Sequence, residues 1–531
     1  MVDAVSDPTP GTGSAPLRFA TPAGRWVLVG TVLGSGMAML DATVVNIALP
    51  RLGSDLHADF AGLQWVLNGY TLTLASLILL GGSLGDRFGR RRTFTIGAVW
   101  FLGASVLCAA SPTIEVLIIA RLLQGIGGAL LTPGSLAILQ SSFHPQDRAR
   151  AIGAWSGLGG VTTALGPFLG GWLVDAASWR WIFLLNLPLG AVVVYVAVVH
   201  LPESKDPTVD GRLDLAGAVL GAAGLAGATY GLIERNAPIG VTGLAVLGAF
   251  VVAEARQRHP MVPLSIFRSR QFSATNAVTM VLYGALAIAL FLIGLVLQEA
   301  LGYSPLEAGL ATLPFTAMML AFSARSGALA QRIGPRLQMA VGPMLVGIGL
   351  VLMVRIEPGR SYGASVLPAV LVMAAGMATT VAPLTSTALA SVSEAHAGVA
   401  SGVNNAVART GSLLAVSVVP LVAGFSAGSA LAPDVLTTGF HRVVLVAAVA
   451  ALVAGALSAV FISNEVLDVD DASDAAETSA TDERSTPRSE STRRTRPSPH
   501  HGPVARPTFH CAADGPPLAG DDRGQTVTAT D

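Results

Sequence analysis

About fourteen apolar runs, each close to the length of a membrane-spanning helix, follow one another along most of this 531-residue chain. An α-helix needs about 20 mostly apolar residues to cross the hydrocarbon core of a bilayer. The runs that approach this length cover residues 26–49, 64–84, 93–111, 116–139, 151–175, 181–200, 213–233, 238–254, 273–298, 308–330, 337–354, 363–390, 398–424 and 441–463. Charged residues make up only 12% of the sequence, against about a quarter in soluble domains. The sequence therefore predicts an all-α polytopic membrane protein.

A short motif after the second apolar run recurs after the tenth. Residues 82–91 read GSLGDRFGRR, and residues 327–336 read GALAQRIGPR. A plain turn held inside by arginines would explain the basic residues, but not the leucine and both glycines that recur in register. Such internal repetition is typical of transporters built from two homologous bundles. The pattern indicates that the chain consists of two related halves.

This motif resembles the signature between the second and third helices of major facilitator superfamily transporters. The resemblance implies two pseudo-symmetric six-helix bundles with two additional helices between them. We expect a cytoplasmic N-terminal segment, an N-terminal bundle, the two additional helices with their linkers, a C-terminal bundle and a disordered cytoplasmic tail, at residues 1–25, 26–200, 201–272, 273–463 and 464–531. The resemblance also implies a cytoplasmic gate formed by Gly82, Asp86, Arg87, Gly89, Arg90 and Arg91. Gln331 stands where the first copy has Asp86, so the second copy lacks the acidic partner of such a gate.

The distribution of basic residues predicts the orientation in the membrane. Lys and Arg near helix ends are retained in the cytoplasm. With the N-terminus inside, the cytoplasmic segments carry roughly sixteen basic residues against six on the other side. The first residues are polar, and the first apolar run is too long for a signal peptide, so we expect it to stay as the first helix. The sequence predicts a multi-pass protein of the cytoplasmic membrane with both termini in the cytoplasm.

The first apolar run contains a carboxylate near its middle. Asp41 lies in the sequence LDATVVNIALP, and a charged residue at the centre of a membrane helix costs about 2.5–3.5 kcal/mol on insertion scales. It is either a structural acid hydrogen-bonded between helices or a site for a proton or cation that faces the central cavity. The string resembles the signature of the fourteen-helix drug:proton antiporter family, in which the first-helix acid is implicated in coupling and in recognition of cationic drugs. Twelve-helix facilitators generally lack it.

The fourth run reads RLLQGIGG from Arg121 onward. On a 3.6-residue helix Arg121, Gly125 and Gly128 share one face, where small residues allow a neighbouring backbone to approach. The arginine reaches into the bundle or, as the alternative, extends to the membrane surface. The pattern resembles the proton-transfer motif of the family, so Asp41 and Arg121 are the predicted residues for proton coupling and for binding of a substrate cation.

The fifth run is rich in glycine and contains a proline. Gly166, Pro167, Gly170 and Gly171 form a GPxxGG string, whose small residues suit close helix packing and whose proline favours a kink. Ordinary close packing of two helices would explain these residues. The string also resembles the fifth-helix motif of the exporters in the family, and this resemblance implies outward transport.

Other polar residues in the runs match the fourteen-helix family more loosely. The resemblance covers about residues 25–463, with the stronger motifs in the first half. It includes the WRWIFLLNLP string that begins at Trp179 and the NNAVART string that begins at Asn404. We expect the following residues to line a central cavity: Asn46, Gln64, Tyr70, Gln124, Asn404, Asn405 and Arg409.

Together these features predict a proton-coupled antiporter that exports an amphipathic drug or natural product, cationic or aromatic, by alternating access. The alternative is an uptake or osmolyte carrier of the same fold, and a membrane enzyme or receptor is disfavoured because no nucleophile, metal or cofactor constellation is visible. We expect no cofactor, no metal and no nucleic acid partner. The expected partners are the small-molecule substrate, protons and the lipid bilayer, with the protein as a monomer.

The segment after about Asn464 differs in composition from the rest of the chain. It begins with an acidic run and continues rich in Ser, Thr, Arg and Pro. Such a segment cannot bury enough apolar surface to offset its ordering entropy, so we expect disorder. Its basic stretch leaves a role in regulation or lipid contact open. Cys108 lies in the third run and Cys511 in this tail, which makes a structural disulfide unexpected.

Overall fold

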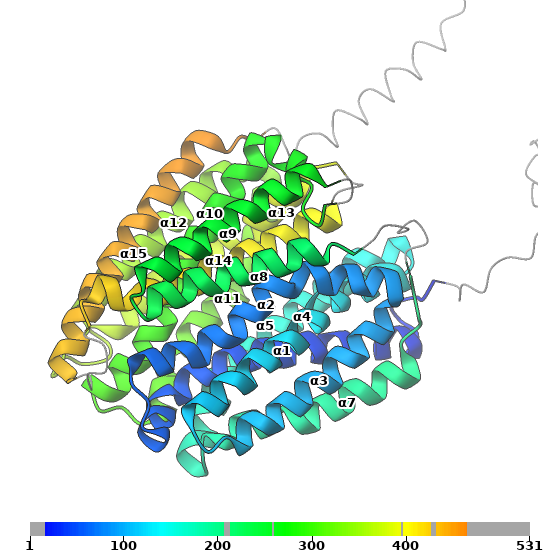
Figure 1. The fold of residues 1–531 in the computed structure, drawn as a ribbon. Helices are drawn as coiled ribbons and strands as arrows, with labels where there is room; N and C mark the ends of the chain where they lie inside the picture. Colours follow the sequence, from blue (N-terminus) through cyan, green and yellow to red (C-terminus); the bar gives the residue numbers. More distant parts are fainter. Residues whose placement is uncertain (1–15, 206–212, 258–259, 394–396, 426–431, 465–531) are drawn as a thin grey trace, which may run out of the picture. The chain divides into compact units, whose positions relative to one another are not determined.

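The computed structural model describes residues 16–205, 213–257, 260–393, 397–425 and 432–464. Within these residues fourteen helices are long and apolar enough to cross a membrane (Figure 1). The N-terminal half comprises α1 (Pro22–Leu56), α2 (Phe60–Phe88), α3 (Arg90–Ala110), α4 (Ile114–Ser142), α5 (Pro145–Ala176) and the joined pair α6 (Arg180–Leu184) and α7 (Asn186–His200). Two additional helices follow, α8 (Leu215–Ile233) and α9 (Ala237–Arg256). The C-terminal half comprises α10 (Arg270–Leu295) with the π-helical turn η2 (Val296–Ala300), α11 (Pro305–Ile333), α12 (Arg336–Leu352), α13 (Val366–Ala390), α14 (Ala397–Ala423) and α15 (Pro433–Phe461).

The two halves repeat the same packing pattern. In the first half α2 and α3 each pack against α4, and α1 packs against α5 and α7. In the second half α11 and α12 each pack against α13, and α10 packs against α14 and α15. Each helix pair of the first half therefore has an equivalent pair in the second half. The helices α1 to α5 correspond to α10 to α14, and α7 corresponds to α15. The duplication predicted from the repeated motif is confirmed, as are the helical architecture and the two additional helices between the halves.

Polar side chains mark the helix starts where the backbone leaves its N–H groups unpaired. The side chains of Thr21, Asp59 and Thr113 accept hydrogen bonds from the first turns of α1, α2 and α4. Ser304 and Glu307 form a reciprocal capping box at the start of α11. The turn between α2 and α3 needs a glycine, because Gly89 has φ 115° and a Cβ there would lie 2.6 Å from an Oε1 atom of Glu203.

Several helices extend beyond the predicted apolar runs. The run predicted to end at residue 49 continues to Leu56, through Pro50, because proline removes one hydrogen bond without ending a well-packed helix. The last helix begins at Pro433 and not at 441, since its first two turns carry polar residues that hydropathy alone excludes. The sixth run is divided by Leu185 into α6 and α7. The tail from 465 onward and the first fifteen residues lie outside the described part, so the expectations for them stay predictions.

The loops define two ends of the helix bundle. The backbone of Leu17, just before α1, pairs with Ser142 after α4, and the backbone N–H of Arg90 donates to Ser204 after α7. We call this end, at which α1 begins, the terminal end. The end at which α1 finishes and α2 begins, near residues 56–60, is the opposite end.

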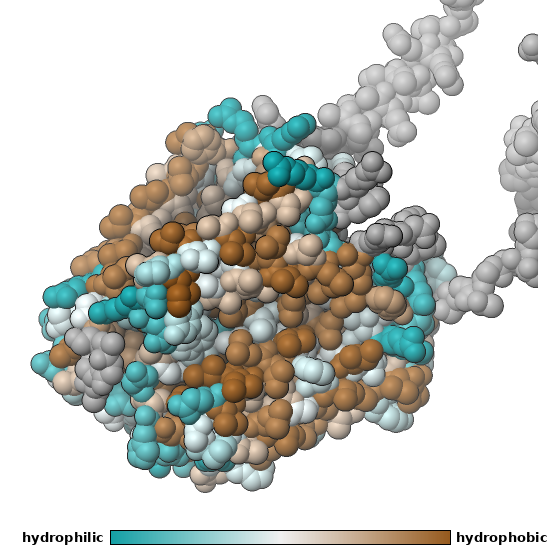
Figure 2. All heavy atoms as spheres, viewed as in Figure 1, coloured by the Kyte–Doolittle hydropathy of each residue, from teal (hydrophilic) through white to brown (hydrophobic). Residues whose placement is uncertain are grey.

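The additional helices lie along the line where α2 meets α14 (Figure 1). Leu225 of α8 packs with Leu72 of α2 and Leu413 of α14 in one small cluster. α9 packs on α8 and leaves its outer side chains exposed, such as Val241 at 66% and Leu244 at 61%. Figure 2 shows that this face is mostly hydrophobic over the helices, with hydrophilic residues gathered towards their ends. Such a surface is suited to contact with lipid.

Candidate functional site

A buried ion pair occupies the centre of the N-terminal half. Asp41 of α1 is 1% exposed and Arg121 of α4 is 0% exposed, and a guanidinium nitrogen of Arg121 lies 2.5 Å from Oδ2 of Asp41. The two candidate residues, eighty positions apart in the sequence, therefore meet directly. Arg121 lies inside the bundle and does not extend to the membrane surface. Asp41 is likewise shielded from any cavity in this conformation.

Amide and hydroxyl groups complete the coordination of this pair. Gln124, one turn after Arg121, donates to Oδ1 of Asp41 at 2.9 Å and accepts from Arg121 at 2.6 Å. Asn186, at the start of α7, donates to the same Oδ1 at 3.1 Å. Ser105 of α3 accepts from both amides, at 2.9 Å from Gln124 and 3.2 Å from Asn186. We call these five residues the Asp41 network. It joins α1, α3, α4 and α7.

Two members of the Asp41 network were not predicted as site residues. Asn186 lies in the WRWIFLLNLP string, and the break at Leu185 between α6 and α7 places it at a helix start. Ser105 lies in the apolar second half of α3, and no feature of the sequence distinguishes it. Asn186 is the one amide in this string, and apolar residues separate it from the tryptophans. A lone amide in an apolar run is the sequence feature that could have identified it.

Arg121 also connects the Asp41 network to α2. Its Nε donates to the backbone carbonyl of Val66 at 3.0 Å, and its guanidinium carbon lies 4.5 Å from the centre of the Tyr70 ring. The Tyr70 hydroxyl donates to the carbonyl of Ala38 on α1 at 3.4 Å. Gly125 of α4 makes this approach possible, because a Cβ there would collide with the carbonyl oxygen of Tyr70. The predicted cavity residue Tyr70 is thus almost fully buried and packs on the ion pair.

The two halves are hydrogen-bonded to each other at the opposite end. Near the start of α2, Gln64 donates to the carbonyl of Val416 at 2.5 Å and Asn68 donates to Ser417 at 3.0 Å. Gln298 donates to the carbonyl of Ile47 at 3.0 Å, and Asp175 accepts from the backbone of Leu306 at 2.9 Å. We call these four hydrogen bonds the opposite-end seal.

The GPxxGG string of α5 packs closely beside the opposite-end seal. A Cβ on Gly171 would lie 2.5 Å from the carbonyl oxygen of Pro305, and a Cβ on Gly309 would collide with the carbonyl oxygen of Pro167. Gly166 and Gly170 face α1 of their own half, at Thr43 and Val44. The string therefore packs α5 against α1 of its own half and against α11 of the other half.

We expect Gly171→Val to open the opposite end, because the added methyl groups would collide with the backbone of α11. Spin labels at Ser54→Cys and Ser361→Cys, both exposed at that end, would report the distance between the halves. The distance distribution should shift to longer values in the variant. Gly103→Val is the control, since a Cβ at Gly103 meets open space, and an equal shift in the control would contradict this assignment.

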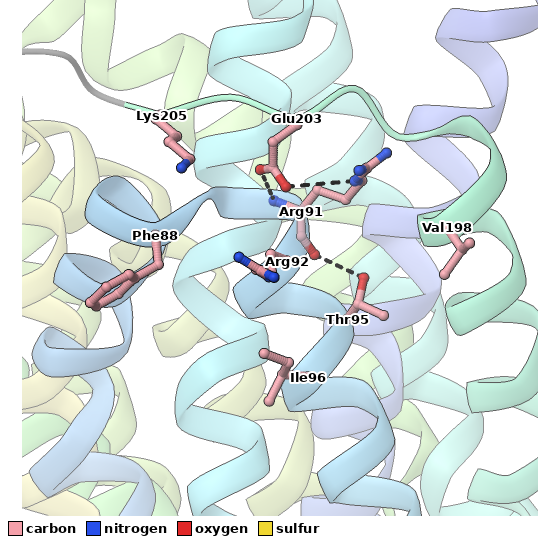
Figure 3. A pocket seen from close by; sticks show the side chains of 8 residues that line it. All are labelled: Phe88, Arg91, Arg92, Thr95, Ile96, Val198, Glu203 and Lys205. Atoms are coloured by element: carbon pink, nitrogen blue, oxygen red, sulfur yellow. Dashed lines mark hydrogen bonds and ion pairs between the residues drawn. The ribbon is translucent and has the colours of Figure 1, made fainter.

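The repeated motif lies at the terminal end. Arg90 of α3 pairs with Asp86 of α2 across the turn at 2.8 Å, and Arg91 pairs with Glu203 at 3.6 Å. The neighbouring pocket has a volume of about 490 Å³. Figure 3 shows the side chains that line it, from α2, α3, α7 and the segment after α7. Among the other predicted gate residues, Gly82 lies almost two helical turns before the end of α2, Arg87 in its last turn and Gly89 directly after it. The motif thus joins α2, α3 and residues 203–204 into one unit.

The remaining cavity candidates lie on both sides of the interface between the halves. Asn46 donates to Ala42 of its own helix at 3.1 Å, and Asn404 of α14 donates to Asn276 and Thr279 of α10 at 3.1 and 2.9 Å. Asn405 and Arg409 are half-buried. The structure thus places Gln124 and Tyr70 with the ion pair, Gln64 in the opposite-end seal, and Asn404 within the C-terminal half.

Known proteins resemble this chain in sequence and in fold. The sequence profile of the Major Facilitator Superfamily matches residues 31–416. The probable actinorhodin transporter of Streptomyces coelicolor is 36% identical, with 77% of this chain and 73% of that one aligned. The tetracenomycin C resistance and export protein of Streptomyces glaucescens is 33% identical, with 77% of each chain aligned.

A solved structure of a POT peptide transporter superimposes with a TM-score of 0.63 over 85% of this chain and 97% of that one, at 14% identity, which supports the fold alone. The profile match covers most of the chain and includes the helices that carry the Asp41 network. This chain therefore belongs to the major facilitator superfamily, has fourteen membrane helices in its described part as its drug:proton antiporter family does, and is a multi-pass membrane transporter rather than an enzyme.

Proposed function

We propose that this protein is a proton-coupled antiporter that exports an amphipathic drug or natural product, cationic or aromatic, across the cytoplasmic membrane. The observation that carries the proposal is the buried Asp41–Arg121 pair, since intramembrane ionisable residues by default mark ion and substrate pathways. The resistance and export proteins among its relatives support the class of cargo and the direction. We further propose that the transporter acts as a monomer with both termini in the cytoplasm.

The contacts of Arg121 suggest how proton binding would reach the interface between the halves. Protonation of Asp41 would remove the charge that holds Arg121, which also contacts Val66 and Tyr70 of α2. Gln64 and Asn68 of the opposite-end seal flank Val66 on the same helix. A change in the ion pair would therefore act on the seal through one rigid helix.

The seal also suggests which state the structure represents. Its four hydrogen bonds all lie towards the opposite end, whereas nearer the terminal end α5 borders open space, because a Cβ at Gly153 or Gly157 would meet no atom within 4 Å. With the terminal end in the cytoplasm, this is an inward-facing state. Alternating access would then require the opposite-end seal to break.

Transport by purified protein in liposomes tests the proposal. Vesicles with an acidic lumen would receive fluorescein or rhodamine 123 from outside, and the dye retained after filtration would be measured after lysis at one pH. We expect protein-dependent uptake of at least one dye, abolished by a protonophore. Fluorescein is informative because an acid does not accumulate passively in an acidic lumen. Dye movement in the same direction as the protons would instead indicate an uptake carrier and contradict the proposal.

A further inference from the structure

Arg409 lies in the middle of α14 on the face that meets α2. Gly402 and Val416 lie seven positions before and after it, about two helical turns away on the same face. Gly402 approaches the side chain of Leu79, and Val416 accepts the hydrogen bond from Gln64, both on α2. Arg409 is therefore on the inner surface of the C-terminal half, at the interface between the halves.

Arg409 has no ion pair or hydrogen bond within the described part of the chain. It is half-buried, so its side chain remains accessible from the interface between the halves. Arg121 differs, because its charge is compensated by Asp41. An intramembrane guanidinium without a counter-charge is costly unless something else supplies one.

The remaining charges of the helices do not supply it. Among the described residues, Asp41 is the sole acidic residue away from the ends of the membrane helices, and it is already paired. Arginines occupy such positions in α4, α11, α14 and α15. A cationic cargo would find no free carboxylate near Arg409, whereas an anionic cargo would find an uncompensated positive charge.

We propose that Arg409 binds the acidic group of the transported compound, so that the cargo is an aromatic compound with a carboxylate or phenolate rather than an organic cation. This inference rests on the proposed export function and narrows its substrate class. The planar guanidinium can donate two parallel hydrogen bonds to a carboxylate, and such charge-assisted bonds are strong where water is partly excluded. Tyr283 of α10, also half-buried, lies close by, since its backbone carbonyl accepts a hydrogen bond from Ser412, one turn after Arg409 on α14. In this arrangement the Asp41 network of the N-terminal half binds the proton, and Arg409 of the C-terminal half binds the cargo.

Equilibrium binding of two dyes tests this assignment without any proton gradient. Fluorescein and rhodamine 123 share the xanthene ring system but carry opposite charges, so anisotropy titrations of the purified protein compare charge at nearly constant shape. Wild-type protein should bind fluorescein more tightly. Arg409→Gln should weaken fluorescein binding about tenfold or more, the loss expected for a hydrogen bond to a charged group, and leave rhodamine 123 binding unchanged or tighter. Arg409→Lys should be intermediate because it keeps the charge but not the fork.

Arg360→Gln is the matched control, since it removes an exposed arginine from the loop between α12 and α13 of the same half. Equal fluorescein affinity in wild type and folded Arg409→Gln, or an equal loss in the control, would overturn the inference. If Arg409→Gln does not fold, the inference is tested by the relative affinity of the wild type for the two dyes and by the Arg409→Lys variant. Wild-type protein that binds fluorescein no better than rhodamine 123 would contradict the inference. Arg409-dependent binding without proton-coupled transport would defeat the antiport proposal alone.

Discussion

Asp41→Asn is expected to reduce uphill dye transport to the level of protein-free liposomes. The amide can still accept the hydrogen bonds from Gln124 and Asn186, but it cannot bind and release a proton. Downhill dye exchange should persist, since the helices that form the interface between the halves are unchanged. The measurement is dye uptake under an imposed pH gradient, compared with counterflow in its absence.

The variant leaves Arg121 without its counter-charge, so a loss of stability is also expected. Removing one partner of a buried ion pair costs about 3–5 kcal/mol. A melting curve of the purified variant separates this loss from the loss of coupling. Asp55→Asn is the control on the same helix, because Asp55 lies outside the Asp41 network and an amide oxygen there can still accept the hydrogen bond from the Trp179 indole. Uphill transport by Asp41→Asn at the wild-type rate would exclude Asp41 as the proton carrier.

Arg121→Ala is expected to abolish both coupled transport and exchange. The change leaves Asp41 as an unpaired buried charge and removes the contacts to Val66 and Tyr70, at a cost of about 3–5 kcal/mol in the free energy of unfolding. Arg121→Lys should retain part of the activity, because it keeps the charge although it cannot reproduce the separate bonds from Nε and a terminal nitrogen.

Thermal unfolding and counterflow together measure this prediction. Arg51→Ala is the control, since it removes an arginine whose side chain is 64% exposed and should change neither quantity appreciably. Normal stability and transport in Arg121→Ala would mean that the ion pair contributes to neither folding nor coupling.

The sequence allowed prediction of the features that depend on local pattern. The apolar runs located the fourteen membrane helices found among the described residues, and the repeated motif indicated the two halves that the packing then confirms. Asp41 and Arg121 stood out individually because charges are rare inside membrane helices. Helix ends were less predictable, since polar turns such as the start of α15 are helical but not apolar.

Contacts between helices could not be predicted in the same way. The direct pairing of Asp41 with Arg121, and the inclusion of Ser105 and Asn186, depend on how α1, α3, α4 and α7 pack. Gln64 was expected to line a cavity but donates across the interface to α14, because the partner is a backbone carbonyl that no sequence pattern marks. The uncompensated charge of Arg409 likewise became visible only when the neighbours of α14 were known.

Proton movement driven by a dye gradient is the most direct test of proton-coupled export. Liposomes containing the protein, a trapped pH indicator and a potassium clamp of the membrane voltage would be loaded with fluorescein and diluted into dye-free buffer. We expect dye efflux to drive protons into the lumen, a protonophore to dissipate the resulting pH change, and Asp41→Asn to show dye efflux without that pH change. Wild-type dye efflux at the same rate with no movement of protons would exclude proton-coupled export.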